Sequence, residues 1–164
     1  MRSQSNVGIA ACAAAFILVL AVSAYWDASI RVLHVFESVP YLVAALLSWR
    51  RAKAGYAVGF VSGVFWLWCA GFLTTFLRNG FERLSVLVRT GSVDRPDILI
   101  AVPAAIATAG IAFLSVASYA REPKKGWKDV LWLGAASVIV PAYFVTIFYG
   151  FAPQYLEMFR RLVR

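Results

Sequence analysis

The stretch "VGIAACAAAFILVLAVSAYW", residues 7–26, holds no charged side chain and decides the fold class. About 20 apolar residues are enough for an α-helix to cross the hydrocarbon core of a bilayer. The apolar residues are continuous, whereas a strand of a membrane barrel alternates apolar with polar residues. Arg2 and the small residues "VSA" at 22–24 also fit a signal peptide. We interpret the stretch as a membrane-spanning helix.

Four more stretches have the same length and apolar character. The chain is 62% hydrophobic and 15% charged, whereas soluble domains are about 45–50% apolar and about 25% charged. The sequence therefore predicts an all-α fold, a single integral membrane helical bundle over residues 1–164, with about five transmembrane helices and short amphipathic interfacial helices. The further expected spans are residues 30–49, 56–77, 98–120 and 130–151.

Two polar segments beside the spans have the pattern of helices that lie in the plane of the lipid headgroups. In residues 80–91, apolar side chains such as Phe81 and Leu84 share one helical face, and charged side chains take the other. Residues 155–164 show the same division. Both segments are expected to be short interfacial helices, or else helix ends whose arginines reach toward the headgroups.

The formal net charge of +8 indicates contact with lipid headgroups rather than with nucleic acid, because the basic residues lie in short clusters beside apolar runs. No nucleic-acid-binding motif accompanies them. The 16 lysines and arginines divide equally between the two sides of a five-span bundle, so the positive-inside rule does not decide the orientation. The clusters at 50–53 and 121–128 are the densest, which favours a cytoplasmic N-terminus in a multi-pass membrane protein.

The second span carries a polar stripe. At helical spacing, Arg31, His34, Glu37 and Tyr41 fall on one face. Glu37 lies roughly 10 Å along the axis of the span, at 1.5 Å per residue, where an ionised carboxylate is costly unless it is paired. His34 is the best-placed partner. The stripe is either a proton-linked or ligand-binding site, with Glu37 as the titrating group, or a structural cluster that pins this helix to its neighbours.

The third span carries three glycines at strict four-residue spacing, Gly55, Gly59 and Gly63. Small residues at this spacing let another helix approach closely, so that van der Waals contact replaces the missing hydrophobic driving force. The motif predicts helix packing, within the bundle or between protomers, and no chemistry.

A polar cluster of Arg78, Asn79, Glu82 and Arg83 follows the third span. Its charges are suited to a lipid phosphate or to a loop of a partner protein. The alternative is a solvated helix end, in which Arg78 and Glu82 pair at four-residue spacing. Both interpretations place the cluster at the membrane surface.

Catalytic signatures are absent from the sequence, which contains no Walker loop, HExxH, GxSxG or CxxC motif. We predict no catalytic residue and no metal site, because one histidine without further ligands does not hold a metal or a haem. The sequence does not identify a cofactor.

Three functions fit these features. The first is a non-catalytic subunit or assembly scaffold of a larger membrane complex, with other membrane proteins or copies of itself as partners in the bilayer. The second is a homo-oligomeric transporter or channel for protons or a small solute, which uses Glu37 and His34. The third is an intramembrane enzyme that acts on lipid.

Overall fold

The computed structural model describes residues 4–155 and residue 157. Within these residues the secondary structure is entirely helical, and five helices are long and apolar enough to cross a membrane. The predicted all-helical class and the number of long apolar helices are therefore confirmed. The helices are α1 (Gln4–Trp26), α2 (Arg31–Trp49), α3 (Lys53–Trp68) with its π-helical continuation η2 (Cys69–Leu73), α6 (Ala101–Ala120) and α7 (Trp127–Phe151).

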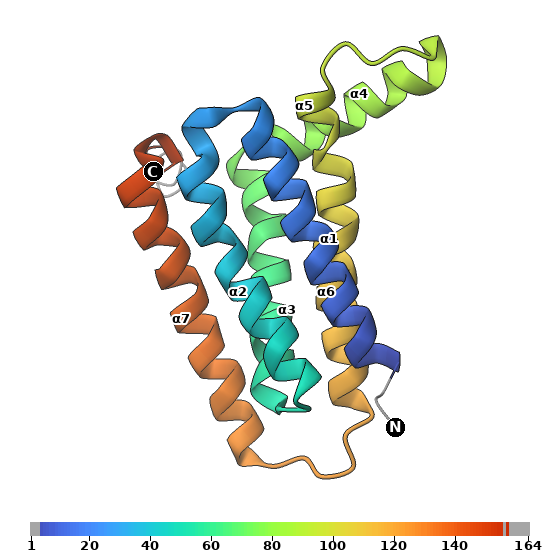
Figure 1. Ribbon diagram of the computed structural model, residues 1–164. Helices are drawn as coiled ribbons and strands as arrows, with labels where there is room; N and C mark the ends of the chain where they lie inside the picture. The colour runs from blue at the N-terminus through green and yellow to red at the C-terminus, as the bar shows by residue number, and fades with distance from the viewer. Residues whose placement is uncertain (1–3, 156, 158–164) are drawn as a thin grey trace.

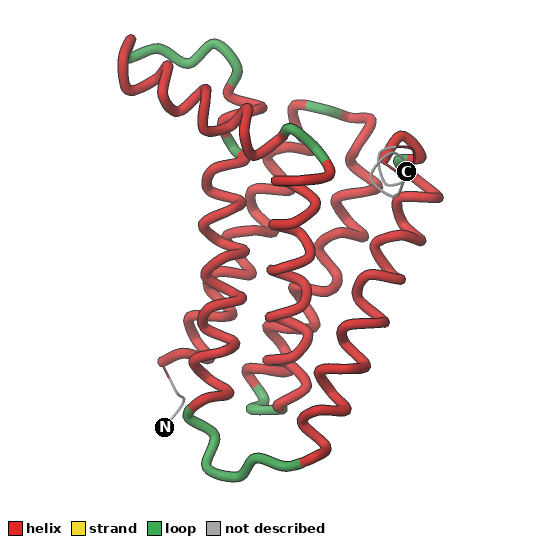
Figure 2. The backbone as a smooth tube through the Cα atoms, turned by 180° about the vertical axis from the view of Figure 1, so that it is seen from behind, coloured by secondary structure: helices red, strands yellow, loops and turns green. Residues whose placement is uncertain are grey.

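Four of the long helices close into a ring. In this four-helix bundle of α1, α2, α3 and α6, each helix packs against two of the others. α7 lies outside the ring, mainly against α3 and to a lesser extent against α2 (Figure 1). From behind, the long helices run side by side, and the segment that joins η2 to α6 projects from one end of the bundle (Figure 2). α3 therefore has three helical neighbours, and it is the most buried of the five.

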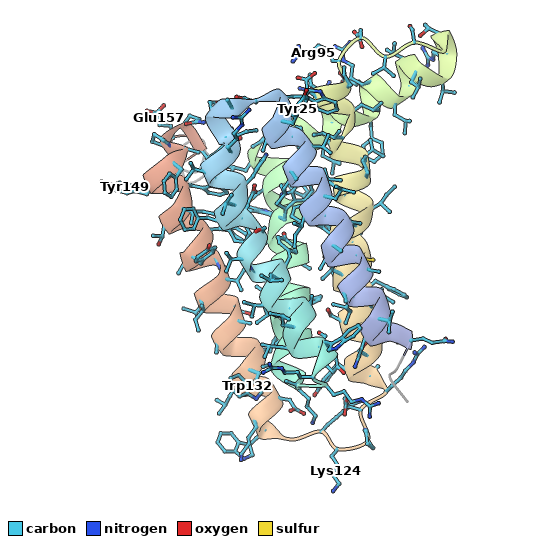
Figure 3. The ribbon with its side chains drawn as sticks, viewed as in Figure 1. Tyr25, Arg95, Lys124, Trp132, Tyr149 and Glu157 are labelled. Atoms are coloured by element: carbon cyan, nitrogen blue, oxygen red, sulfur yellow. The ribbon has the colours of Figure 1, made fainter. Side chains whose placement is uncertain are left out.

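The two ends of the bundle differ in their loops. The end that carries residues 25–31 and 74–79 is named the cavity end here, and the end that carries residues 121–128 is named the lysine end. Tyr25 lies at the cavity end and Lys124 at the lysine end (Figure 3). α1 begins at the lysine end and α7 finishes at the cavity end (Figure 1), as an odd number of passes along the bundle requires.

The glycine face of α3 is used inside the bundle. A Cβ added at Gly55 would lie 2.5 Å from the backbone nitrogen of Ser48, in the last turn of α2. A Cβ at Gly63 would lie 2.6 Å from the carbonyl oxygen of Thr108 on α6, and Gly59 also faces α6. Of the two packing arrangements expected for this motif, these contacts correspond to the first, packing within the bundle.

The third span ends earlier than the sequence predicts. η2 ends just before Thr74, whose backbone is extended, with φ −118° and ψ 168°. The Thr74 hydroxyl donates to the carbonyl of Ala70 (3.2 Å) and accepts from the backbone N–H of Phe76 (3.3 Å). This side chain thus supplies hydrogen bonds that a continuing helix would otherwise make. The expected continuous helix over residues 56–77 is wrong at this end.

A separate helix, α4 (Phe76–Thr90), projects away from the ring at the cavity end (Figure 1). It contains most of the amphipathic segment expected at residues 80–91 but begins earlier. Gly91 ends it in the left-handed conformation, with φ 67°, which costs glycine little. α5 (Pro96–Leu99) then leads the chain back to α6. The amphipathic helix expected at residues 155–164 lies mostly outside the described residues.

Candidate functional site

A cavity of about 310 Å³ lies inside the bundle near the cavity end. Small-molecule pockets have volumes of about 300–1,000 Å³, so this cavity has room for a small ligand. Every long helix contributes to its wall, together with η2 and α4. The polar side chains of the wall include Ser23, His34, Glu37, Thr74, Thr75 and Asn79, and the aromatic ones are Trp66, Phe76, Phe144, Phe148 and Tyr155.

The Glu37 carboxylate lies against this cavity on a residue that is only 7% exposed. Its Oε2 is 2.7 Å from Nδ1 of His34, one turn earlier on α2, and the spacing in the sequence predicts this pair. Nε2 of His34 lies 3.1 Å from the hydroxyl of Ser23 on α1. A chain of three polar side chains therefore runs from α1 to the cavity and holds the carboxylate in place.

His34 keeps both hydrogen-bond partners, Glu37 and Ser23, whether its imidazole is neutral or protonated. A neutral imidazole donates from Nδ1 to Glu37 and accepts at Nε2 from the hydroxyl of Ser23, whereas an imidazolium donates from both nitrogens, because a hydroxyl also accepts. With the neutral ring the trio carries a single negative charge, and with the imidazolium it is neutral overall. The hydrogen bonds of the trio are therefore compatible with either form of the His34 imidazole.

Local contacts at the start of α2 orient the stripe, and they lie outside the cavity. Arg31 donates from Nε to the carbonyl of Ala24 (2.8 Å), so it caps the last turn of α1. Asp27 accepts from the hydroxyl (2.6 Å) and the backbone N–H (2.9 Å) of Ser29. These two bonds, the hydroxyl first, lower the pKa of the Asp27 carboxyl. Arg31 thus serves the helix connection rather than the cavity.

Tyr41 is also turned away from the cavity. It is fully buried and donates to the carbonyl of Ser62 on α3 (3.1 Å). Its ring centroid lies 4.3 Å from that of Phe16, and Phe16 lies 5.2 Å from Trp66. Tyr41 follows Glu37 by about one turn of α2, on the side of the lysine end. The aromatic side chains of Phe16, Tyr41 and Trp66 therefore form a layer between Glu37 and the lysine end of the four-helix bundle.

The chain just after α7 covers one side of the cavity. Tyr155 lines it and packs on Phe148, with 5.2 Å between ring centroids. Burial, and then the negative charge of Glu37, raise the pKa of the Tyr155 hydroxyl. Tyr155 and Glu37 therefore line the same cavity.

The polar cluster after the third span is divided among separate contacts. Asn79 lines the cavity. Arg78 pairs with Glu82 (3.1 Å) on an exposed side of α4. Arg83 pairs instead with Asp94 (2.5 Å) in the loop that follows α4. These four residues do not gather around one point, and Asn79 alone among them faces the candidate site.

The lysine end has polar contacts of its own. The Tyr56 hydroxyl donates to Oδ1 of Asn6 (3.1 Å) and lies 3.4 Å from Oε1 of Glu122. Lys53 pairs with Asp129 (2.8 Å) beside a smaller cavity of about 200 Å³. These contacts tie α3 to α1, to the segment after α6 and to the start of α7, and we regard them as structural.

Replacing Tyr56 with phenylalanine is expected to lower the free energy of unfolding by about 1 kcal/mol, because it removes one hydrogen bond to a buried partner. Asn6 is 3% exposed and would lose its tyrosine donor. The matched control is Tyr25→Phe, at a side chain that is 79% exposed. Reversible unfolding in mixed micelles measures both. Equal stability of the two variants would contradict the structural role of the Tyr56 hydroxyl.

Three parts of the site were not predicted from the sequence: the contact with Ser23, the η2 turn and the position of Trp66 at the cavity. Ser23 lies on α1, and spacing along α2 carries no information about contacts with another helix. The η2 turn has one weak signal, the threonine pair Thr74 and Thr75 inside an apolar run, since hydroxyl side chains compete for backbone hydrogen bonds. Trp66, which the sequence places in the middle of a span, lines the cavity and also packs on Phe16.

Comparison of the chain with protein-family models, with curated protein sequences and with solved structures finds no match in any of the three. The functional argument therefore starts from the geometry of the cavity and from the chemistry of the side chains around it.

Proposed function

We propose that this protein is a multi-pass integral membrane transporter or channel that carries protons, or a small solute coupled to protons, by way of Glu37 and His34. One observation carries the proposal: the buried Glu37 side chain lines a cavity of about 310 Å³ instead of being packed against protein on every side. Ionisable groups inside membrane bundles are costly, and they commonly mark the pathways of ions and protons.

The shape of the site supports access from one side. Thr75 and Asn79, at the cavity end, belong to the cavity wall. On the other side, the aromatic layer of Phe16, Tyr41 and Trp66 separates Glu37 from the lysine end. The cavity thus lies toward one end of the bundle, with the aromatic layer between Glu37 and the other end. A transporter that works by alternating access likewise opens its binding site to one side of the membrane at a time.

Buried hydroxyl groups beyond the aromatic layer support a route for protons toward the lysine end. In the part of the chain that the structure describes, these hydroxyls have no hydrogen-bond partner, although buried polar groups normally have one. Such groups are suitable partners for internal water. They belong to Ser48, Ser62, Ser115 and Ser118, on α2, α3 and α6.

Flux measurements in liposomes test the proposal. The purified protein is reconstituted, a pH gradient is imposed, and an internal dye reports proton movement with salt alone or with choline, glycine betaine or sorbitol inside. We expect a proton flux in at least one condition. Glu37→Gln should reduce it by at least about tenfold, since an amide side chain cannot carry the proton that a carboxyl group binds and releases.

The matched control is Glu157→Gln, the same chemical change at an exposed residue beyond α7 (Figure 3), which should leave the flux unchanged. No flux under any of the four conditions would overturn the proposal. A flux that Glu37→Gln leaves intact would show that the protein transports protons by another route.

A scaffold or subunit function is the second candidate, and α4 favours it. This helix projects from the ring, and its side chains Phe81 and Val88 are 52% and 78% exposed (Figure 1). The glycine face of α3, which the sequence also allowed as a contact between protomers, packs against α2 and α6 inside the bundle. Native mass spectrometry after gentle extraction from the membrane decides between the two: a scaffold appears with larger subunits, and a transporter appears alone or as a small homo-oligomer.

An enzyme acting on lipid has less support. Its headgroup contacts would come from Arg78, Glu82 and Arg83, which are engaged in two separate ion pairs outside the cavity. The proposed orientation, with the N-terminus in the cytoplasm, stays a prediction. It is tested by labelling a cysteine introduced at Lys124, which lies at the lysine end (Figure 3).

A further inference from the structure

The charge of the cavity wall restricts what the cavity can hold. Among the described residues that line it, Glu37 is the only acidic side chain and there is no lysine or arginine. The nearby Arg31 is turned to the carbonyl of Ala24. With a neutral His34 the site carries a single negative charge. An anion would meet repulsion in a site of low polarity, whereas a monovalent cation would neutralise it.

The rest of the wall is suited to an organic cation. Trp66, Phe144, Phe148 and Tyr155 contribute aromatic rings, whose faces attract ammonium groups. Inorganic cations prefer several oxygen or nitrogen ligands, and no group of three His, Cys, Asp or Glu side chains occurs in the described part of the chain. Most of the remaining wall is aliphatic: Val19, Leu20, Ile30, Leu33, Leu73 and Ile100. Its uncharged polar side chains, Thr74, Thr75 and Asn79, lie at the cavity end.

We infer that the cavity binds a small monovalent organic cation of the alkylammonium class in exchange for a proton; this rests on the proposed transport function and names its solute. The protonated trio of Ser23, His34 and Glu37 is neutral overall. When the cation enters, the imidazolium of His34 releases its proton to water, and the cation takes over the charge of the Glu37 carboxylate. The charge inside the bundle is the same before and after the exchange.

The proposed exchange takes its proton from the His34–Glu37 pair. The other titratable groups around Glu37 must therefore be considered as alternative sources of that proton. They are Tyr41 on α2, Cys69 on η2 and Tyr155 after α7, with Asp27 on the far side of His34. Tyrosine and cysteine side chains are ordinarily neutral near pH 7, and an aspartate is already ionised. We therefore assign the exchanged proton to the pair of Glu37 and His34, whose Oε2 and Nδ1 atoms lie 2.7 Å apart.

Calorimetry on the full-length protein tests the inference directly. Choline is titrated into the protein in buffers of different ionisation heat, between about pH 5 and pH 8, the range in which histidine changes its charge. Choline carries its charge at every pH, so any proton released comes from the protein. The control ligand is the neutral isostere of choline, in which a tert-butyl group replaces the trimethylammonium group.

We expect choline to bind at least about tenfold more tightly than its isostere, and to release about one proton per choline at the acidic end of the range. Glu37→Gln should remove both effects, and Glu157→Gln should retain them. Equal binding of choline and the isostere would overturn the cation assignment. Choline binding without proton release would overturn the exchange.

The outcomes also separate this inference from the proposed function. If proton flux in liposomes depends on Glu37 but choline does not bind, the transporter stands and the solute class is wrong. If choline binds and releases a proton but no flux is found, the cavity is a cation-binding site and the transport function fails. The choline titration is repeated in lipid nanodiscs, without detergent, because a detergent molecule in the cavity would block choline.

Discussion

Adding one methyl group at Gly63 is expected to lower the free energy of unfolding by about 1–3 kcal/mol relative to the same addition at Gly134. A Cβ at Gly63 would lie 2.6 Å from the carbonyl oxygen of Thr108 and 3.1 Å from Cβ of Ala112, so α3 and α6 must separate. At Gly134, on α7, nothing lies within 4 Å of the added atom. Both positions are helical, so the gain in helix propensity, about 1 kcal/mol, cancels in the comparison.

Reversible unfolding of Gly63→Ala and Gly134→Ala in mixed micelles of a denaturing and a mild detergent measures this difference. Gly134→Ala should be as stable as the native protein or slightly more so. If Gly63→Ala unfolds at the same detergent composition as Gly134→Ala, then α3 and α6 do not approach as closely as described, and the arrangement of the four-helix ring is wrong.

The helices themselves could be predicted from the sequence because a chain in lipid must satisfy its backbone hydrogen bonds within each segment. Long apolar runs such as residues 7–26 therefore allow few structures besides a helix. Close packing of α3 was also predictable, since the spacing of Gly55, Gly59 and Gly63 belongs to one helix. Which helix fills the glycine face was not, because that depends on the arrangement of all five.

The break at Thr74 and the cavity were beyond the reach of sequence patterns for the same reason. Residues 69–77 are mostly apolar, and the threonine pair Thr74 and Thr75 is only a weak sign that the helix widens to a π turn and stops. The pair of His34 and Glu37 was predictable because both side chains lie on α2. Their third partner, Ser23, and the ring of Trp66 come from other helices, so only the assembled bundle places them at the site.

Replacing His34 with alanine is expected to lower the free energy of unfolding by about 2–3 kcal/mol, somewhat less than the roughly 3–5 kcal/mol found when a fully enclosed ion pair loses one member. The change leaves the Glu37 carboxylate, on a residue that is 7% exposed, without its imidazole partner at 2.7 Å. The adjacent cavity can admit water to the carboxylate, which reduces the loss. Unfolding in mixed micelles measures the effect, and the exposed Tyr25→Phe change serves as the control.

Glu37→Gln should lower the free energy of unfolding much less than His34→Ala does. The difference between the two variants decides whether the His34–Glu37 pair is a functional site or a structural contact. A glutamine oxygen still accepts from Nδ1 of a neutral His34, so the variant leaves no unpaired charge and its stability should change by less than about 1 kcal/mol. Added to His34→Ala, it should restore most of the lost stability, because it removes the charge that His34 no longer balances. If instead the ion pair between an imidazolium and the Glu37 carboxylate stabilised the fold, Glu37→Gln would cost about as much as His34→Ala and the double variant would recover no stability. A variant that keeps the stability of the native protein but loses proton flux would show that Glu37 is retained for its charge and not for the fold.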